Sequence, residues 1–166
     1  VGAYPISPGQ LGRALLSPVF PSLRAGLPDA VREILFAIRL PRLLLALVAG
    51  AGLGISGASL QALFKNPLVN EYTLGISSGA AFGASLSLVF LGSGVPPQLS
   101  AFAFAVAAVL VVLAVARSSD SPIVTLLLAG VIVSAFFSAL LSLVEFFASP
   151  YALQSLFYWL MGNLSS

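Results

Sequence analysis

The stretch "NPLVNEYTLGISSGAAFG", residues 66–83, contains the two features that decide the fold. It begins with a polar turn, in which Asn66 and Pro67 are typical of a helix stop. It continues with a glycine at every fourth position, at Gly75, Gly79 and Gly83. Residues four apart share one face of a helix, so the glycines predict a seam where a second helix backbone approaches closely.

Long apolar runs on both sides of this turn set the protein class. Hydrophobic residues make up 59% of the chain and charged residues 7%, whereas a soluble domain has about 25% charged residues. The mean hydropathy is +1.08. These values predict an integral membrane protein.

Composition also excludes several kinds of chemistry. The chain has no cysteine and no histidine, which removes disulfides, Ser-His and Cys-His catalysis and the commonest metal ligand. It has no phosphate-binding loop, and its net charge of +2 is too small to indicate a nucleic-acid partner. We therefore expect no enzyme, no cofactor, no metal site and no nucleic acid.

Four apolar stretches have about the length of 20 residues that a membrane crossing needs. They cover approximately residues 43–64, 73–91, 98–116 and 123–146, and only the last contains a charged residue, Glu145 near its end. Around them we expect irregular structure over residues 1–27, an amphipathic surface helix with Asp29 as its N-cap over 29–39, and a short interfacial segment after Pro150. Because every backbone group must be paired inside lipid, the predicted fold is all-α and polytopic, with about four transmembrane helices plus short amphipathic or interfacial helices.

Small residues recur at four-residue spacing in three of the four stretches. The rows are Gly50 and Gly54 in the first, Gly75, Gly79 and Gly83 in the second, and Gly130, Ser134, Ser138 and Ser142 in the fourth. Such rows favour close helix packing. Glu145 is the one carboxylate inside a predicted span, and both an interfacial position and a functional role stay open for it.

Longer patterns resemble a known family. The run "RLPRLLLALVAGAGLGISGASLQALFKNPLVNEYTLGISSGAAFG" (39–83), with "LLLAGV" (126–131) and "YWLMGNL" (158–164), is similar to the FecCD/BtuC-like permease subunits of ABC importers for iron-siderophore, haem and cobalamin (vitamin B12). "YPISPGQL" (4–11) resembles the loop after the family's first helix. The resemblance implies a multi-pass permease in the cell (inner) membrane. Its implied partners are an ABC ATPase subunit, an extracytoplasmic substrate-binding protein and a second permease subunit, in a homo- or heterodimer within membrane lipid.

The same resemblance places the chain within the permease. It is similar to helices two to five of ten, so residues 1–166 are expected to form a single, incomplete transmembrane permease domain. The turn at Asn66 and Pro67 would face the cytoplasm. Arg39 and Arg42 would lie outside and dock the binding protein, with snorkelling to lipid headgroups as the alternative. The positive-inside rule alone would favour the opposite orientation.

The fourth span is expected along the translocation path. The resemblance places its beginning, Ile123 and Val124, near the cytoplasmic gate. The path-lining row would be Gly130, Ser134, Ser138 and Ser142. The alternative is that Ser134 and Ser138 bond carbonyls one turn back in their own helix.

Two other functions stay open. "NPL" (66–68) is similar to the aquaporin NPA motif, but an aquaporin needs two such motifs and this chain has one, so a channel is the first alternative. The second is a purely structural membrane protein. The sequence does not distinguish between the substrates of the family.

Overall fold

The computed structural model describes residues 4–24, 26–117 and 121–162, and the regular structure within these ranges is entirely helical. The chain divides into two compact units, residues 1–51 with 164–166, and residues 52–163. Three helices are long and apolar enough to cross a membrane, Asp29–Phe64, Pro97–Ala116 and Ile123–Phe147. The prediction of an all-α fold with several membrane-spanning helices is confirmed.

The first unit begins with a helix that the sequence analysis missed. Helix α1 (Pro8–Leu16) starts at a capping box, in which the Ser7 hydroxyl accepts a hydrogen bond from the Gln10 backbone and the Gln10 side chain accepts one from Ser7. A short 3-10 helix, η1 (Pro21–Arg24), follows. The prediction of irregular structure over 1–27 was wrong, because the cap and a proline at the first helical position outweigh the local glycines.

A single continuous helix covers residues 29–64. It consists of α2 (Asp29–Glu33), a π-helical segment η2 (Ile34–Arg39) and α3 (Leu40–Phe64). The prediction of a separate surface helix was wrong here. A proline ring normally clashes with the carbonyl four residues earlier. Before Pro41 the helix widens to a π turn, in which the Leu40 amide bonds to the Leu35 carbonyl, and the helix therefore continues. Asp29 is the first helical residue and Pro28 the cap.

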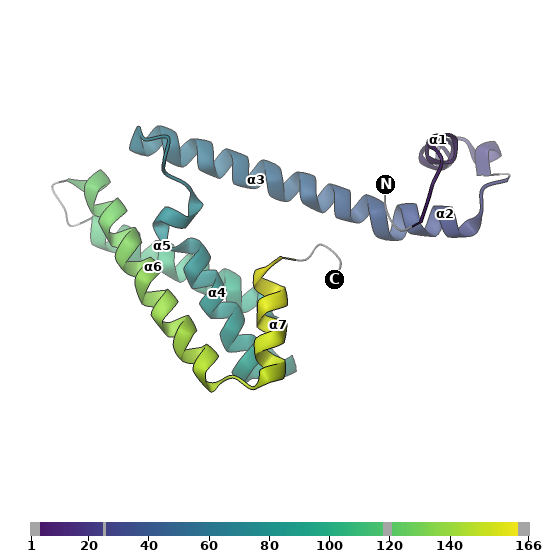
Figure 1. The fold of residues 1–166 in the computed structure, drawn as a ribbon. Helices are drawn as coiled ribbons and strands as arrows, with labels where there is room; N and C mark the ends of the chain where they lie inside the picture. Colours follow the sequence, from purple (N-terminus) through teal and green to yellow (C-terminus); the bar gives the residue numbers. More distant parts are fainter. Residues whose placement is uncertain (1–3, 25, 118–120, 163–166) are drawn as a thin grey trace. The chain divides into compact units, whose positions relative to one another are not determined.

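The second unit is a bundle in which α4 (Ile76–Leu86), α5 (Pro97–Ala116) and α6 (Pro122–Phe147) pack against one another. Helix α7 (Pro150–Leu160) lies beside α4 (Figure 1). The bundle also contains three short elements. They are the 3-10 helices η3 (Glu71–Leu74) and η5 (Gly92–Gly94) and the π-helical segment η4 (Ser87–Leu91).

The second predicted span is shorter than expected. Its helix begins at Ile76 and ends at Leu91, about 24 Å at 1.5 Å per residue, whereas the hydrocarbon core is about 30 Å thick. The cause is Gly75, whose φ of +73° ends η3 and makes the chain enter α4 later. Of the four predicted spans, this one is therefore a short apolar helix.

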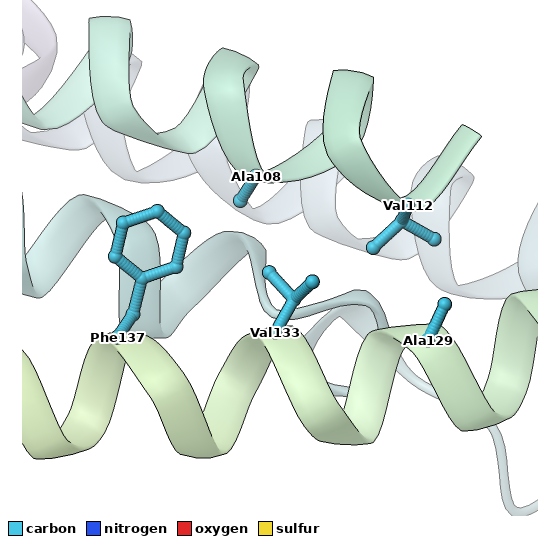
Figure 2. Packing of buried hydrophobic residues seen from close by; sticks show 5 residues of the cluster. All are labelled: Ala108, Val112, Ala129, Val133 and Phe137. Atoms are coloured by element: carbon cyan, nitrogen blue, oxygen red, sulfur yellow. The ribbon is translucent and has the colours of Figure 1, made fainter. Parts of the chain in front are cut away.

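Apolar side chains join the three helices of the bundle. Ala108 and Val112 of α5 point toward Ala129, Val133 and Phe137 of α6 (Figure 2). Phe82 of α4 completes the contact, because its ring lies 5.7 Å from that of Phe137 and 5.1 Å, edge to face, from that of Phe104. This core fixes the position of α4 against α6, where the candidate site lies.

Candidate functional site: a serine-lined groove between α4, α6 and α7

The beginning of α4 crosses α6 at a point that only glycine allows. A Cβ on Gly75 would lie 3.1 Å from the Ser134 backbone nitrogen, and a Cβ on Gly130 would overlap the Thr73 carbonyl oxygen. One turn further along α4, the Ser78 and Ser134 hydroxyls form a hydrogen bond of 2.7 Å. Ser134 therefore bonds across the helix interface and not, as the alternative held, within its own helix.

The other two glycines of the row lie against α5. A Cβ on Gly79 would be 2.8 Å from the Phe104 carbonyl oxygen, and one on Gly83 would be 2.5 Å from that of Ser100. The Ser100 hydroxyl donates to the Gly83 carbonyl at 2.6 Å. The glycine row of the opening stretch thus contacts two helices, α6 at its beginning and α5 further along.

The glycines of α3 have different surroundings. A Cβ on Gly50 or Gly54 would meet nothing within 4 Å, and no residue in the apolar window of that helix is buried. Their role in helix packing stays a prediction.

A groove opens beside the α4–α6 crossing, with a volume of about 430 Å³. Hydroxyl and indole groups line it together with leucine and alanine side chains. Its polar members are Tyr72, Ser77, Ser78, Ser138 and Trp159, and Leu141 and Leu160 are its largest aliphatic ones. It is therefore amphipathic, with contributions from η3, α4, α6 and α7.

The groove holds hydroxyls that are not used by the fold. Ser85 and Ser155 of the same helices donate to backbone carbonyls at 2.7 and 3.0 Å, the usual arrangement for serine in a helix. Ser77 and Ser138 form no such bond with any described residue. Their hydroxyls are available to a molecule in the groove.

The predicted row on α6 does not form one face. Four residues advance a helix by one turn and about 40° more, so the row winds around α6. Gly130 is buried, Ser134 is half-buried, Ser138 lines the groove, and Ser142 is exposed away from it. At the beginning of the same helix Ile123 and Val124 are exposed, and their role in a gate stays a prediction.

The predicted docking arginines differ in their contacts. Arg39 is half-buried and donates from Nη2 to the Tyr4 carbonyl at 2.7 Å. Arg42 is exposed. Arg39 therefore also holds the N-terminal segment, whereas Arg42 is open to a partner.

The polar turn is a helix stop followed by a cap. The Asn66 amide reaches the Gln61 carbonyl at 3.2 Å, and the Asn66 side chain accepts from the Leu68 amide at 3.0 Å. Asn70 then caps η3 by accepting from the Tyr72 amide at 3.2 Å. Pro67 is exposed between them. "NPL" thus lies in a turn and does not begin a half-helix, so the geometry gives no support to the channel alternative.

Sequence reasoning missed the groove residues outside α6. Ser77 and Ser78 lie between the glycines of the row, and Trp159 lies in the short segment after Pro150 that was expected at the membrane interface. The sequence position of Ser78 relative to the glycines could have revealed its role. Ser78 precedes Gly79 by one residue, which places it about 100° around the helix. It therefore lies on the side of α4 that faces α6 and not α5.

Comparison with known proteins decides the family. The model of the FecCD transport family matches residues 1–166. The chain belongs to this family. Its members are permease subunits of ABC transporters, which are integral to the cell membrane and are not themselves enzymes.

Named relatives and a solved structure agree with this assignment. The Helicobacter pylori "Probable iron chelatin transport system permease protein" is 43% identical over 80% of this chain and 40% of the relative. The molybdate import system permease protein MolB of Haemophilus influenzae is 36% identical over 100% of this chain and 49% of the relative. A solved structure assigned to the metal-chelate type of ABC transporter, inward-facing, has a TM-score of 0.77 and 33% identity over 95% of this chain and 54% of that chain.

The lengths of these FecCD relatives matter for function. The chain spans between 40% and 49% of the two curated permeases. What is confirmed is the family, the polytopic helical fold and the membrane location. The transport activity, cargo and partners belong to the proposal that follows.

Proposed function

We propose that this FecCD-family chain contributes the helices around the cargo path of a permease in an ABC importer. The cargo class is an iron chelate, haem or cobalamin. The chain itself catalyses no reaction, and a separate ATPase subunit supplies the energy. The observation that carries this proposal is the groove beside the α4–α6 crossing, which combines a rigid wall with unused hydroxyls.

The rigid wall follows from the packing. Backbone-to-backbone approach at Gly75 and Gly130, together with the Ser78–Ser134 hydrogen bond, leaves little freedom between α4 and α6. A wall that keeps its shape suits a site past which a bulky molecule must move. The available hydroxyls of Ser77 and Ser138 offer weak, replaceable hydrogen bonds, so a cargo would be held and released without a large barrier.

The remaining parts of the proposal concern the two ends of the path. The beginning of α6, with the exposed apolar residues Ile123 and Val124, would narrow the cytoplasmic end by a hydrophobic constriction. Arg42, and Arg39 in part, would dock an extracytoplasmic binding protein through complementary charge. A second permease subunit would close the path from the other side.

A substitution in the groove tests the central part of this proposal. Ser138→Leu places a branched apolar side chain in the groove without touching the Ser78–Ser134 pair. In vesicles that contain the permease with its ATPase and binding protein, it should block cargo uptake while the ATPase still co-purifies. Ser155→Leu is the matched control, because Ser155 is exposed on α7 and does not line the groove. Normal uptake by the Ser138 variant would contradict the proposal.

A further inference from the structure

We propose that a second groove, between α4 and α5, binds one acyl chain of an anionic phospholipid, and that Arg117 at the end of α5 pairs with the phosphate of this lipid. The inference goes beyond transport, because it assigns a lipid site outside the groove at the α4–α6 crossing. It uses the membrane location of the chain and the side chains of α4 and α5.

The α4–α5 groove is lined by hydrocarbon. It has a volume of about 300 Å³, and among the described residues only apolar side chains line it. Helix α4 contributes Ile76, and all other lining residues belong to α5. They are Phe102, Ala105, Val106, Val109 and Leu110. These side chains offer no hydrogen bond to a polar ligand, so a hydrocarbon chain fits the groove best.

The groove exists because α4 begins late. The glycines of α4 lie against the α5 backbone, Gly83 at Ser100 and Gly79 at Phe104, so the two helices run antiparallel in close contact. Helix α4 begins at Ile76, which lies beside the second half of α5. Beyond this point no residue of α4 accompanies α5 toward its end, and the α5 surface there is open to a ligand.

The two faces of α5 carry side chains of different size. Ala108 and Val112 point toward α6 (Figure 2), and the buried residues of this packed face are mostly small. They are Ser100, Ala101, Ala108, Val112 and Ala116. The groove face carries larger side chains, of which Phe102, Val106 and Leu110 are exposed. Because helices in a membrane associate through small residues, the groove face suits a flexible lipid chain better than a second helix.

Arg117 lies on the same stripe of α5 as the groove. Its φ of −62° and ψ of −25° continue the helix, so seven residues place it two turns beyond Leu110 and only about 20° around the axis. Its side chain is exposed, as is that of Leu113 between them. The 20 residues of α5 extend over about 30 Å, which is about the thickness of the hydrocarbon core. Arg117 therefore reaches the headgroup layer directly beyond the groove.

The dimensions and the charge fit one leaflet of anionic lipid. From Phe102 to Arg117 the stripe is about 22 Å long at 1.5 Å per residue, close to half of the roughly 40–45 Å of a bilayer with its headgroups. A chain in the groove thus places its phosphate beside Arg117, and a guanidinium binds phosphate through charge-assisted hydrogen bonds. A zwitterionic headgroup would bring its own cation next to this guanidinium, so an anionic headgroup is preferred.

Fluorescence quenching by brominated lipids tests the site, because a chain without cysteine accepts a single thiol-linked fluorophore. Leu110→Cys places the fluorophore in the groove. Val111→Cys is the matched control, since Val111 is adjacent and exposed but lies about 100° around α5 and does not line the groove. The complete permease with its ATPase, otherwise free of cysteine, is placed in phosphatidylcholine nanodiscs. Brominated phosphatidylglycerol or brominated phosphatidylcholine is added at equal mole fractions.

The expected result is a preference for the anionic lipid in the groove. At Leu110→Cys, brominated phosphatidylglycerol should quench with an apparent affinity about fivefold higher than that of brominated phosphatidylcholine, which corresponds to about 1 kcal/mol for one basic residue at the membrane surface. The control position should show no preference. Arg117→Gln should remove the preference while both lipids still quench, because the apolar groove remains. Arg117→Lys should keep most of it, because the charge remains.

Several results would overturn the inference. A fluorophore at Leu110→Cys that neither lipid quenches would show that protein, another part of the permease or a second copy, covers the groove. Equal quenching by the two lipids, a preference that survives Arg117→Gln, or the same preference at Val111→Cys would show that Arg117 selects no lipid there. The assay contains neither cargo nor ATP, so its outcome is separate from that of the transport proposal.

Discussion

The close approach of α4 and α5 at Gly83 gives a quantitative prediction for Gly83→Ala. The added Cβ would lie 2.5 Å from the Ser100 carbonyl oxygen and 3.0 Å from the Phe104 Cβ. An ordinary contact begins near 3.4 Å, so α4 and α5 must separate locally by about 0.9 Å (3.4 minus 2.5). Because the obstacle is backbone, no side-chain rotation relieves it.

The magnitude follows from three contributions. Overpacking costs about 1–3 kcal/mol. Separation also stretches the 2.6 Å hydrogen bond from the Ser100 hydroxyl to the Gly83 carbonyl, a loss of about 0.5–1.5 kcal/mol. Alanine regains about 1 kcal/mol of helix propensity. The free energy of unfolding should therefore fall by about 0.5–3.5 kcal/mol, the sum of these terms.

The assay is unfolding of the purified permease by a denaturing detergent, with Gly94→Ala as the control. A Cβ on Gly94 meets nothing within 4 Å, and that glycine has no positive φ, so its variant should lie within about 0.5 kcal/mol of the parent. Gly130→Ala, whose Cβ would overlap the Thr73 carbonyl oxygen, should be the least stable of the three. Gly83→Ala as stable as the parent would refute the assigned helix contact.

Three further predictions concern the surface and the membrane. Arg42→Glu should weaken binding of the substrate-binding protein in a salt-dependent way without a loss of stability. Arg39→Glu should in addition release the N-terminal segment and increase its proteolysis. Binding by the Arg42 variant that equals that of the parent at low salt would count against docking. In intact cells, an impermeant thiol reagent should label Gly94→Cys from outside and leave Asn70→Cys unlabelled, and the reverse pattern would invert the topology. Unlike Gly94 in the short η5 segment, Gly54 belongs to a small-residue row on the long apolar helix α3, and in the assembled transporter we expect another helix against that face. Gly54→Ala should then destabilise the transporter by about 1–3 kcal/mol through overpacking. An unchanged melting temperature would show that this face of α3 contacts lipid.

The sequence predicted the apolar elements well because their signal is local. Hydropathy and length identify α5 and α6 to within one residue at each end, and they identify the end of α3, since lipid imposes the same demand on each. The beginning of α3 was not identified, because its helix continues back to Asp29. The family was also accessible, because its patterns lie in the turn and the glycine row. The predicted helix face at Gly79 and Gly83 corresponds to backbone contacts with α5.

The remaining features depend on contacts or on backbone geometry that composition does not encode. Gly75 was grouped with the packing glycines, but its left-handed φ also shortens α4. The π turn before Pro41 depends on the hydrogen bond from the Leu40 amide to the Leu35 carbonyl, and a residue pattern does not show which carbonyl an amide selects. Ser134 was predicted to face the path, yet its partner is Ser78, 56 residues away, and only the packed bundle brings the two together.

Reconstituted uptake tests the central claim most directly. Vesicles containing the complete permease and its ATPase, with binding protein added outside, should accumulate a ferric hydroxamate chelate or cyanocobalamin. Accumulation should require ATP and binding protein, and it should disappear with a hydrolysis-deficient ATPase. Entry of cargo that needs neither ATP nor binding protein, at the same rate with the deficient ATPase, would contradict the account and indicate a passive channel.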